Sequence, residues 1–379
     1  MYSETKRIDY LDSIRGLAAL TVLWSHSLGA FDWPAPVFNF INLPFINIVF
    51  DGHSAVTMFF ALSGFVLSRP YLAATGPGQP PRNITLPTFY LRRFTRIWLP
   101  WLAAYILSVV AQRWLFHMPT TTPPVSQWLG SFWHILPTWG NFLKQCVFLE
   151  HNSYVQLLNQ DWSLGVELKG SLLIPLLVFL LVGRRWLFLG LLTLAVFWGP
   201  NTGSAYVTFV LGALLAKYGD GLTQWLKACS LAVRLGCLVT GLAFYETHHI
   251  ARDLYGVTEH GQLFMTGTAL GCGLILLACL SSKRLQATLN WQVLVLFGKI
   301  SFSIYLLQFI PILCGLPPLV RYLNDSGIQQ TWILLPLTLL ASTAMTVGLS
   351  LVNFRLVEMP SIKFGHRLTT LLQERFLKK

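Results

Sequence analysis

Long, mostly apolar segments recur along the whole sequence and restrict the protein to one broad structural class. Windows of about 20 apolar residues, separated by polar breaks, have the length of helices that cross a bilayer. Of the 379 residues, 54% are hydrophobic and 11% are charged, whereas a soluble domain has about 25% charged residues. The sequence lacks the regular alternation of a membrane barrel. We therefore predict an all-α integral membrane protein, with residues 1–379 forming a single transmembrane domain.

The apolar windows predict about ten transmembrane helices, of which the fifth and sixth are short. Their approximate positions are 13–31, 46–68, 93–115, 162–182, 185–200, 203–218, 229–246, 262–281, 292–314 and 331–355. Lys and Arg are concentrated in alternate connections, and the positive-inside rule then places both termini in the cytoplasm. A loop at about 116–161 is expected outside the cytoplasm, and a tail at about 359–379 inside. The net charge of +12 is explained by this asymmetry, so we expect no nucleic-acid partner.

Two ionisable residues interrupt the first predicted span. Arg15 and His26 are eleven residues apart, which is almost three helical turns, so they share one face about 16 Å apart along the axis. An ionisable side chain inside a membrane is costly unless it faces protein or water, and it is a functional-site hypothesis by default. A neutral imidazole can take a proton from a hydroxyl and return it. The alternative is a histidine that is packed and hydrogen-bonded inside the bundle.

The fourth predicted span contains a carboxylate at a depth similar to that of His26. It begins "DWSLGVELKG", and Glu167 then lies about two turns below the outer surface. A carboxylate beside an imidazole fixes its tautomer and stabilises its charged form. The alternative is an ion pair with Lys169 or with another buried cation. Residues two apart do not face each other on a helix, which argues against Lys169 as the direct partner.

An arginine cluster marks the entry to the third predicted span, in "FYLRRFTRIWLPW". Arg93 and Arg96 are three residues apart and share a helix face. Guanidinium groups bind phosphate oxygens with paired hydrogen bonds, so the cluster suits a polyanionic ligand. The alternative is ordinary positive-inside flanking, which fits Arg92 better than the deeper Arg96.

Other polar positions have less specific interpretations. Ser63 and Gly64 favour close packing of helices. Tyr305 and Gln308 are three residues apart and share a helix face. Three tryptophans of the outer loop either stack on a sugar ring or, as we favour, anchor an interfacial helix: Trp128, Trp133 and Trp139. No serine-hydrolase elbow, zinc-protease motif or Walker loop is present, and no metal site is expected.

Taken in order, seven segments resemble the acyltransferase-3 family of membrane O-acyltransferases across nearly the whole chain. They are "YLDSIRGLAALTVLWSH", "FFALSGFVLS", "YLRRFTRIWLPW", "WSLGVELKGSLLIPLL", "FVLGALLA", "FGKISFSIYLLQ" and "VEMPSIK". Arg15 and His26 match the family's first-span pattern, Arg93 and Arg96 match its R-x-x-R, and Glu167 matches the glutamate of W-S-L-x-x-E. This sequence departs from the family at Gln308, where histidine is frequent, and at Lys169, where an aromatic or uncharged residue is common.

The resemblance implies transfer of an acetyl or short acyl group from acyl-CoA, with acetyl-CoA as the expected donor, to a carbohydrate hydroxyl at the cell surface or on an exported molecule. It implies catalytic roles for His26 and Glu167 and phosphate binding by the three arginines. Substrate-binding residues are expected at Ser63, Trp162, Tyr305 and Gln308. No permanently bound cofactor is expected, and the partners are acyl-CoA, the carbohydrate and membrane lipid. The expected location is the inner (cytoplasmic) membrane, and the sequence does not indicate an oligomeric state.

A transporter or flippase is the alternative function, with His26 and Glu167 forming a proton relay. Many transporters contain inverted repeats with broken helices at matching positions. We find no such repeat in the sequence, and this favours the acyltransferase.

Overall fold

The computed structural model describes residues 8–73, 81, 84–146, 157–183, 187, 203–247, 249–250 and 262–377. Their regular structure is helical apart from an isolated bridge between Phe31 and Val125, which confirms the all-α prediction. The chain divides into two compact units that alternate along the sequence. The first comprises Met1–Ala18, His53–Leu86 and Val166–Lys299, and the second comprises Ala19–Gly52, Pro87–Gly165 and Ile300–Lys379. The single transmembrane domain expected from the sequence stays a prediction.

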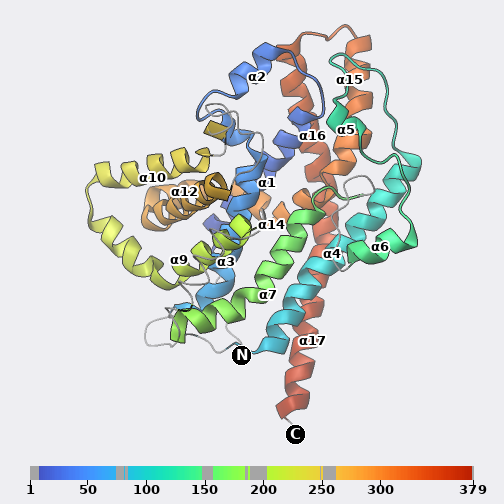
Figure 1. The fold of residues 1–379 in the computed structure, drawn as a ribbon. Helices are drawn as coiled ribbons and strands as arrows, with labels where there is room; N and C mark the ends of the chain where they lie inside the picture. Colours follow the sequence, from blue (N-terminus) through green and yellow to red (C-terminus); the bar gives the residue numbers. More distant parts are fainter. Residues whose placement is uncertain are drawn as a thin grey trace. The chain divides into compact units, whose positions relative to one another are not determined.

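Three helices are divided between the two units well inside their length: α1 (Asp9–Gly29), α7 (Asp161–Gly183) and α14 (Gln292–Leu307). The other helices of the first unit are α3 (Gly52–Leu72), α9 (Gly203–Ala228), α10 (Leu231–Tyr245), α12 (Gln262–Ser281) and α13 (Lys283–Leu289). Within this unit α12 packs against both α9 and α10 (Figure 1). Ser230 begins α10 by accepting a hydrogen bond from the Val233 amide, as expected of a helix N-cap.

The second unit contains the remaining helices and two π-helical turns. They are α2 (Ala35–Ile41), the 3-10 helix η1 (Asn47–Val49), α4 (Leu86–Trp114), α5 (Gln127–Gly130), α6 (Trp139–Cys146), the π-helix η2 (Pro311–Gly315), α15 (Leu316–Asp325), α16 (Thr331–Asn353), the π-helix η3 (Phe354–Glu358) and α17 (Met359–Leu377). In Figure 1, α16 continues into α17 as one column. The helical stretch Thr331–Glu374 has 44 residues, or about 66 Å, roughly twice the hydrocarbon thickness of a bilayer. The predicted tail is therefore a continuation of the last predicted span.

Helices coincide with every predicted span that lies in the described residues, whereas the fifth, 185–200, falls outside them. Within the described part, four helical stretches are long and apolar enough to cross a membrane: α3, α4, α7 and Thr331–Glu374. Two bent pairs, with angles of 98° and 65°, raise this number to six if each pair is one span. These helices support a membrane protein. The ten spans and the orientation of the termini are not confirmed, in part because α1 carries Asp12, Arg15 and His26.

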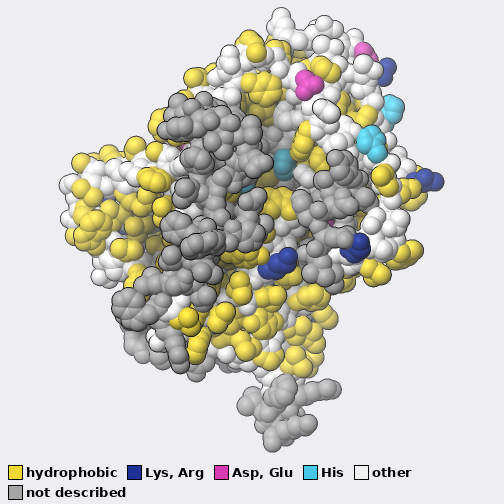
Figure 2. Space-filling model, viewed as in Figure 1, with side chains coloured by type: hydrophobic (Ala, Val, Ile, Leu, Met, Phe, Trp, Pro, Cys, Tyr) yellow, Lys and Arg dark blue, Asp and Glu magenta, His cyan; other side chains and the backbone are white. Residues whose placement is uncertain are grey.

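The surface of the described residues is also typical of a protein in contact with lipid. Figure 2 shows hydrophobic side chains spread widely over the visible face, with few charged groups among them. On α16 and the turn after it, Leu340 and Leu356 are 70% and 71% exposed. Large exposed apolar surfaces in water mark interaction sites, and a bilayer covers such a surface without a protein partner.

Glycines allow two pairs of helices in the first unit to approach until their backbones touch. A Cβ atom added to Gly16 of α1 would lie 2.5 Å from the Gly298 nitrogen of α14. A Cβ atom on Gly212 of α9 would lie 2.7 Å from the Phe65 nitrogen of α3, and one on Gly64 would meet the backbone of Phe209. The expected packing role of Gly64 is thus confirmed. Small residues at membrane helix interfaces allow this close approach.

Replacing Gly16 with alanine should destabilise the protein because the new methyl group overlaps backbone atoms that cannot rotate away. We expect a loss of about 1–3 kcal/mol, as for other overpacked sites, measured as a lower midpoint of thermal unfolding in detergent. Gly273→Ala in α12 is the control, because a Cβ atom there meets nothing within 4 Å and alanine favours helix. Equal midpoints for the two variants would contradict the close contact.

Candidate active site

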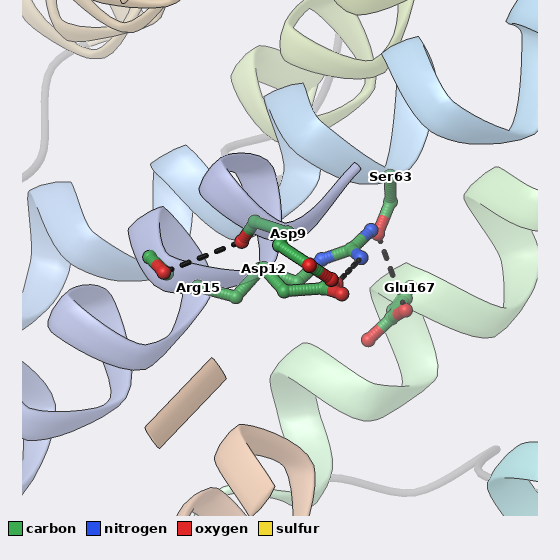
Figure 3. Close-up of polar contacts among 6 residues, drawn as sticks. Asp9, Asp12, Arg15, Ser63 and Glu167 are labelled. Carbon is green, nitrogen blue, oxygen red and sulfur yellow. Dashed lines mark hydrogen bonds and ion pairs between the residues drawn. The ribbon is translucent and has the colours of Figure 1, made fainter. Parts of the chain in front are cut away.

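A polar cluster in the first unit contains Arg15, which we call the Arg15 cluster: Asp12, Arg15, Ser63 and Glu167. The Nη1 atom of Arg15 donates to Oδ1 of Asp12 at 3.3 Å, one turn earlier on α1. The Oγ atom of Ser63 on α3 donates to Oε1 of Glu167 on α7 at 3.3 Å. Figure 3 shows the Arg15 guanidinium directed toward the side where Ser63 and Glu167 lie. Three helices therefore bring a cation, two carboxylates and a hydroxyl together.

This cluster bears on two sequence predictions. Arg15, expected to bind phosphate, is already paired with Asp12, and the two side chains are 17% and 10% exposed. A bound phosphate would therefore compete with that carboxylate for the guanidinium. Glu167 is partly exposed and lies with the Arg15 cluster, whereas His26 belongs to the other unit. The contact between Glu167 and His26 stays a prediction.

In the second unit, the His26 ring is held by an amide and by aromatic side chains. Its Nδ1 atom lies 3.2 Å from Oε1 of Gln308, which directly follows α14. The ring is stacked on Trp128, with centroids 5.6 Å apart and planes at 25°, and its centroid lies 4.9 Å from that of Phe309. The imidazole remains partly exposed. It is thus oriented by the protein without being sealed off.

The predicted outer loop brings Trp128 to His26 by binding the end of α1. Ser126 donates from its backbone nitrogen to the Ala30 carbonyl at 3.0 Å and from Oγ to the Gly29 carbonyl at 2.6 Å. Its Oγ also accepts a hydrogen bond from the Leu129 amide and so begins α5. The short helix that carries Trp128 is therefore fixed only three residues beyond His26.

The three tryptophans of this loop have different environments. Trp128 is 36% exposed and stacks on His26. Trp133 is 5% exposed and donates to the Leu157 carbonyl at 3.0 Å, so its role is structural. Trp139 is 81% exposed, which suits the predicted interfacial anchor.

The start of α7 is bound to the end of α14 through side chains on both. The hydroxyls of Ser163 and Tyr305 form a hydrogen bond, and Gln160 donates to the Leu306 carbonyl at 2.5 Å. Tyr305, predicted to bind substrate, thus has a protein partner for its hydroxyl and is 7% exposed. Trp162 is partly exposed in the first turn of α7, and its contact with substrate stays a prediction.

The arginines of α4 lie in different environments. Arg92 donates from Nε to Thr369 of α17 at 3.1 Å, which gives it a structural contact. Arg93 is 8% exposed, and Arg96 is exposed. The sequence placed Arg93 and Arg96 together because of their spacing, yet the first is covered by protein and the second is not. Their binding of a polyanion stays a prediction.

Sequence reasoning did not identify several partners of the site residues. Asp12 stands in the first-span segment, and its i, i+3 spacing from Arg15 is the signal that indicates this pair. Phe309 directly follows Gln308, and its position next to a candidate site residue is the signal that could have identified it. Ser163 lies inside the quoted W-S-L segment, but nothing in the sequence connects it to Tyr305.

Comparison with known proteins identifies the class. Residues 8–353 match the model of the acyltransferase domain, so the chain belongs to the acyltransferase-3 family. It is similar to O-acetyltransferase PaAT-1 of Phomopsis amygdali, with 25% identity over 367 residues that cover 79% of this chain and 71% of the relative. No solved structure matches the chain. The protein is therefore an O-acyltransferase, and the transporter alternative is not supported.

The contact between Ser163 and Tyr305 can be measured by a double-mutant cycle. Ser163→Ala, Tyr305→Phe and the double variant each remove the hydrogen bond, so the two single effects on unfolding should not add. We expect a coupling of about 0.6 kcal/mol, the average of such cycles in a helical membrane protein. Pairing Tyr305→Phe with Ser326→Ala, an exposed position, is the control and should give additive effects. Additivity in the Ser163 cycle would contradict the contact.

Proposed function

We propose that the protein transfers an acetyl or other short acyl group from acyl-CoA to a hydroxyl of a cell-surface or exported carbohydrate in the cytoplasmic membrane. The observation that carries the proposal is the His26 ring, held at Nδ1 by Gln308 and stacked on Trp128, in a chain that belongs to an acyltransferase family. The name of the Phomopsis amygdali relative, an O-acetyltransferase, favours acetyl as the group and oxygen as the acceptor atom. Trp128, which is 36% exposed beside the base, supports a sugar ring as the acceptor.

His26 acts as the general base in this proposal. It takes the proton from the acceptor hydroxyl while the oxygen attacks the thioester carbonyl carbon. The carbon–sulfur bond then breaks, and the imidazolium returns the proton to the departing thiolate. The products are the acyl ester and coenzyme A, with His26 neutral again. Trp128 and Phe309 exclude water that would otherwise hydrolyse the thioester.

The remaining charged residues bind the acyl-CoA donor or stabilise the imidazolium form of His26. Arg15, Arg93 and Arg96 bind the phosphates of coenzyme A, since guanidinium groups suit phosphate oxygens. In an unbroken helix the eleven residues from Arg15 to His26 span about 16 Å, a distance that suits the extended arm of coenzyme A. Glu167 stabilises the imidazolium, and Ser63 and Trp162 contact substrate.

His26→Ala should abolish transfer while the protein still folds and inserts. Loss of a general base costs roughly 100- to 10,000-fold in rate. The measurement is transfer of labelled acetyl from acetyl-CoA to a panel of glycans by purified protein. His117→Ala, at an exposed position on the chain after α4, should keep full activity. Normal turnover by a folded His26→Ala protein would refute the assignment of the base.

Arg93→Ala and Arg96→Ala should each raise the Michaelis constant for acetyl-CoA, with a smaller effect on the maximal rate. Added salt should reduce the contribution of the exposed Arg96 to donor binding more than that of the buried Arg93, because exposed charges are screened more. Arg92→Ala is the matched control, since Arg92 contacts Thr369 and its loss should lower stability instead. Unchanged donor binding in both test variants would leave the cluster as a signal of topology alone.

A further inference from the structure

Gln308 makes two hydrogen bonds that fix the direction of its amide. Its Nε2 atom donates to the Tyr305 carbonyl oxygen at 3.0 Å, and its Oε1 atom lies 3.2 Å from Nδ1 of His26. A backbone carbonyl only accepts hydrogen bonds, so the amide NH2 group must face Tyr305. The side chain of Gln308 is fully buried, which favours this arrangement over one that leaves the amide unpaired.

The direction of the Gln308 amide determines which ring nitrogen of His26 carries the hydrogen. The amide oxygen is an acceptor, so the Nδ1 atom of His26 must be the donor. In a neutral imidazole one nitrogen carries the hydrogen and the other carries the lone pair. The lone pair is then on Nε2.

We propose that Gln308 is a positioning residue that holds neutral His26 as the Nδ1–H tautomer and so makes Nε2 the atom that takes the acceptor's proton. This inference rests on the proposed function for the proton transfer, but the tautomer itself does not. The role resembles that of a carboxylate that orients a catalytic histidine, in which the wrong tautomer is inactive. Here the orienting group is neutral.

The Gln308 amide orients the His26 ring as a carboxylate would, but without a charge. Among the described residues, the side chains that stack on the His26 ring or hydrogen-bond to it come from α5 and from the two residues after α14: Trp128, Gln308 and Phe309. None of them is charged or titrates near neutral pH. A carboxylate at position 308 would stabilise the imidazolium, so that His26 would remain protonated up to a higher pH. An amide fixes the tautomer and adds no charge.

The first experiment reads the tautomer directly and needs no substrate. Protein labelled with [15N]histidine contains nine histidines, and the His26 signals are assigned as those missing from His26→Gln. We expect a protonated, pyrrole-like Nδ1 and a pyridine-like Nε2 above neutral pH. A protonated Nε2 in the wild-type protein would overturn the role of Gln308 and leave the acyltransferase assignment standing.

The second experiment connects the tautomer to turnover. Gln308→Met keeps the length of the side chain but removes the acceptor, so the Nδ1–H signature should be lost and kcat should fall roughly 10- to 100-fold. The Michaelis constant for acetyl-CoA should not change. Gln112→Met is the matched control, because Gln112 is a buried glutamine that donates to the Trp133 and Ile135 carbonyls. It should lower stability without moving the His26 signals.

Gln308→Glu keeps the inference falsifiable if the methionine variant does not fold. The glutamate retains an acceptor for Nδ1–H, so transfer at alkaline pH should be largely kept. The acidic limb of the rate profile should move to higher pH because the carboxylate stabilises the imidazolium. An unchanged profile, or full turnover by a folded Gln308→Met protein that has lost the tautomer signature, would overturn the inference. Full turnover by His26→Ala would refute His26 as the base, whereas a wild-type protein that transfers no acyl group to any glycan tested would refute the proposed function.

Discussion

Close contacts between α1 and the α14 segment are the constraint on which the packing of each unit depends. Gly16 and Gly298 have no side chains, so the two helices approach until a Cβ atom on either would overlap the other backbone. His26 and Gln308 each lie ten residues further along and are again in contact. Each contact fixes, within its own unit, which face of one segment meets the other. A register shift of a single residue would rotate Gln308 by about 100° and take its amide away from the imidazole.

The sequence was sufficient to predict the class of fold and to indicate candidate site residues, because both leave local signals. Apolar windows of bilayer length indicate helices, and an ionisable residue such as His26 inside one of them is conspicuous. The tight packing at Gly64 could also be predicted. The number of spans could not be confirmed, since polar residues in α1 reduce its resemblance to a span, and α16 continues into α17 without the expected break.

The partners of these residues were not predictable, because they depend on long-range packing. The sequence suggested Glu167 as a partner of His26 from their similar depth, and that contact stays a prediction. It did not indicate that Gln308 lies against Nδ1 of His26 or that Ser63 binds Glu167. Depth gives one coordinate of a residue in a bundle, and contact requires the other two. A pair on one helix, such as Asp12 and Arg15, has all three coordinates fixed by its spacing and could have been predicted.

The neutral partner of His26 has parallels among the buried polar groups of the second unit. Ser163 and Tyr305 pair two hydroxyls there, and the buried Glu358 carboxylate accepts a hydrogen bond from the neutral Ser303 hydroxyl at 2.7 Å. Satisfied neutral hydrogen bonds avoid the several kcal/mol that isolated charges lose on burial. In the proposed mechanism, His26 beside a neutral amide is uncharged before the reaction, and its imidazole becomes charged only when an acceptor hydroxyl supplies the proton. An ionisable ring in an apolar segment then carries a charge only during transfer.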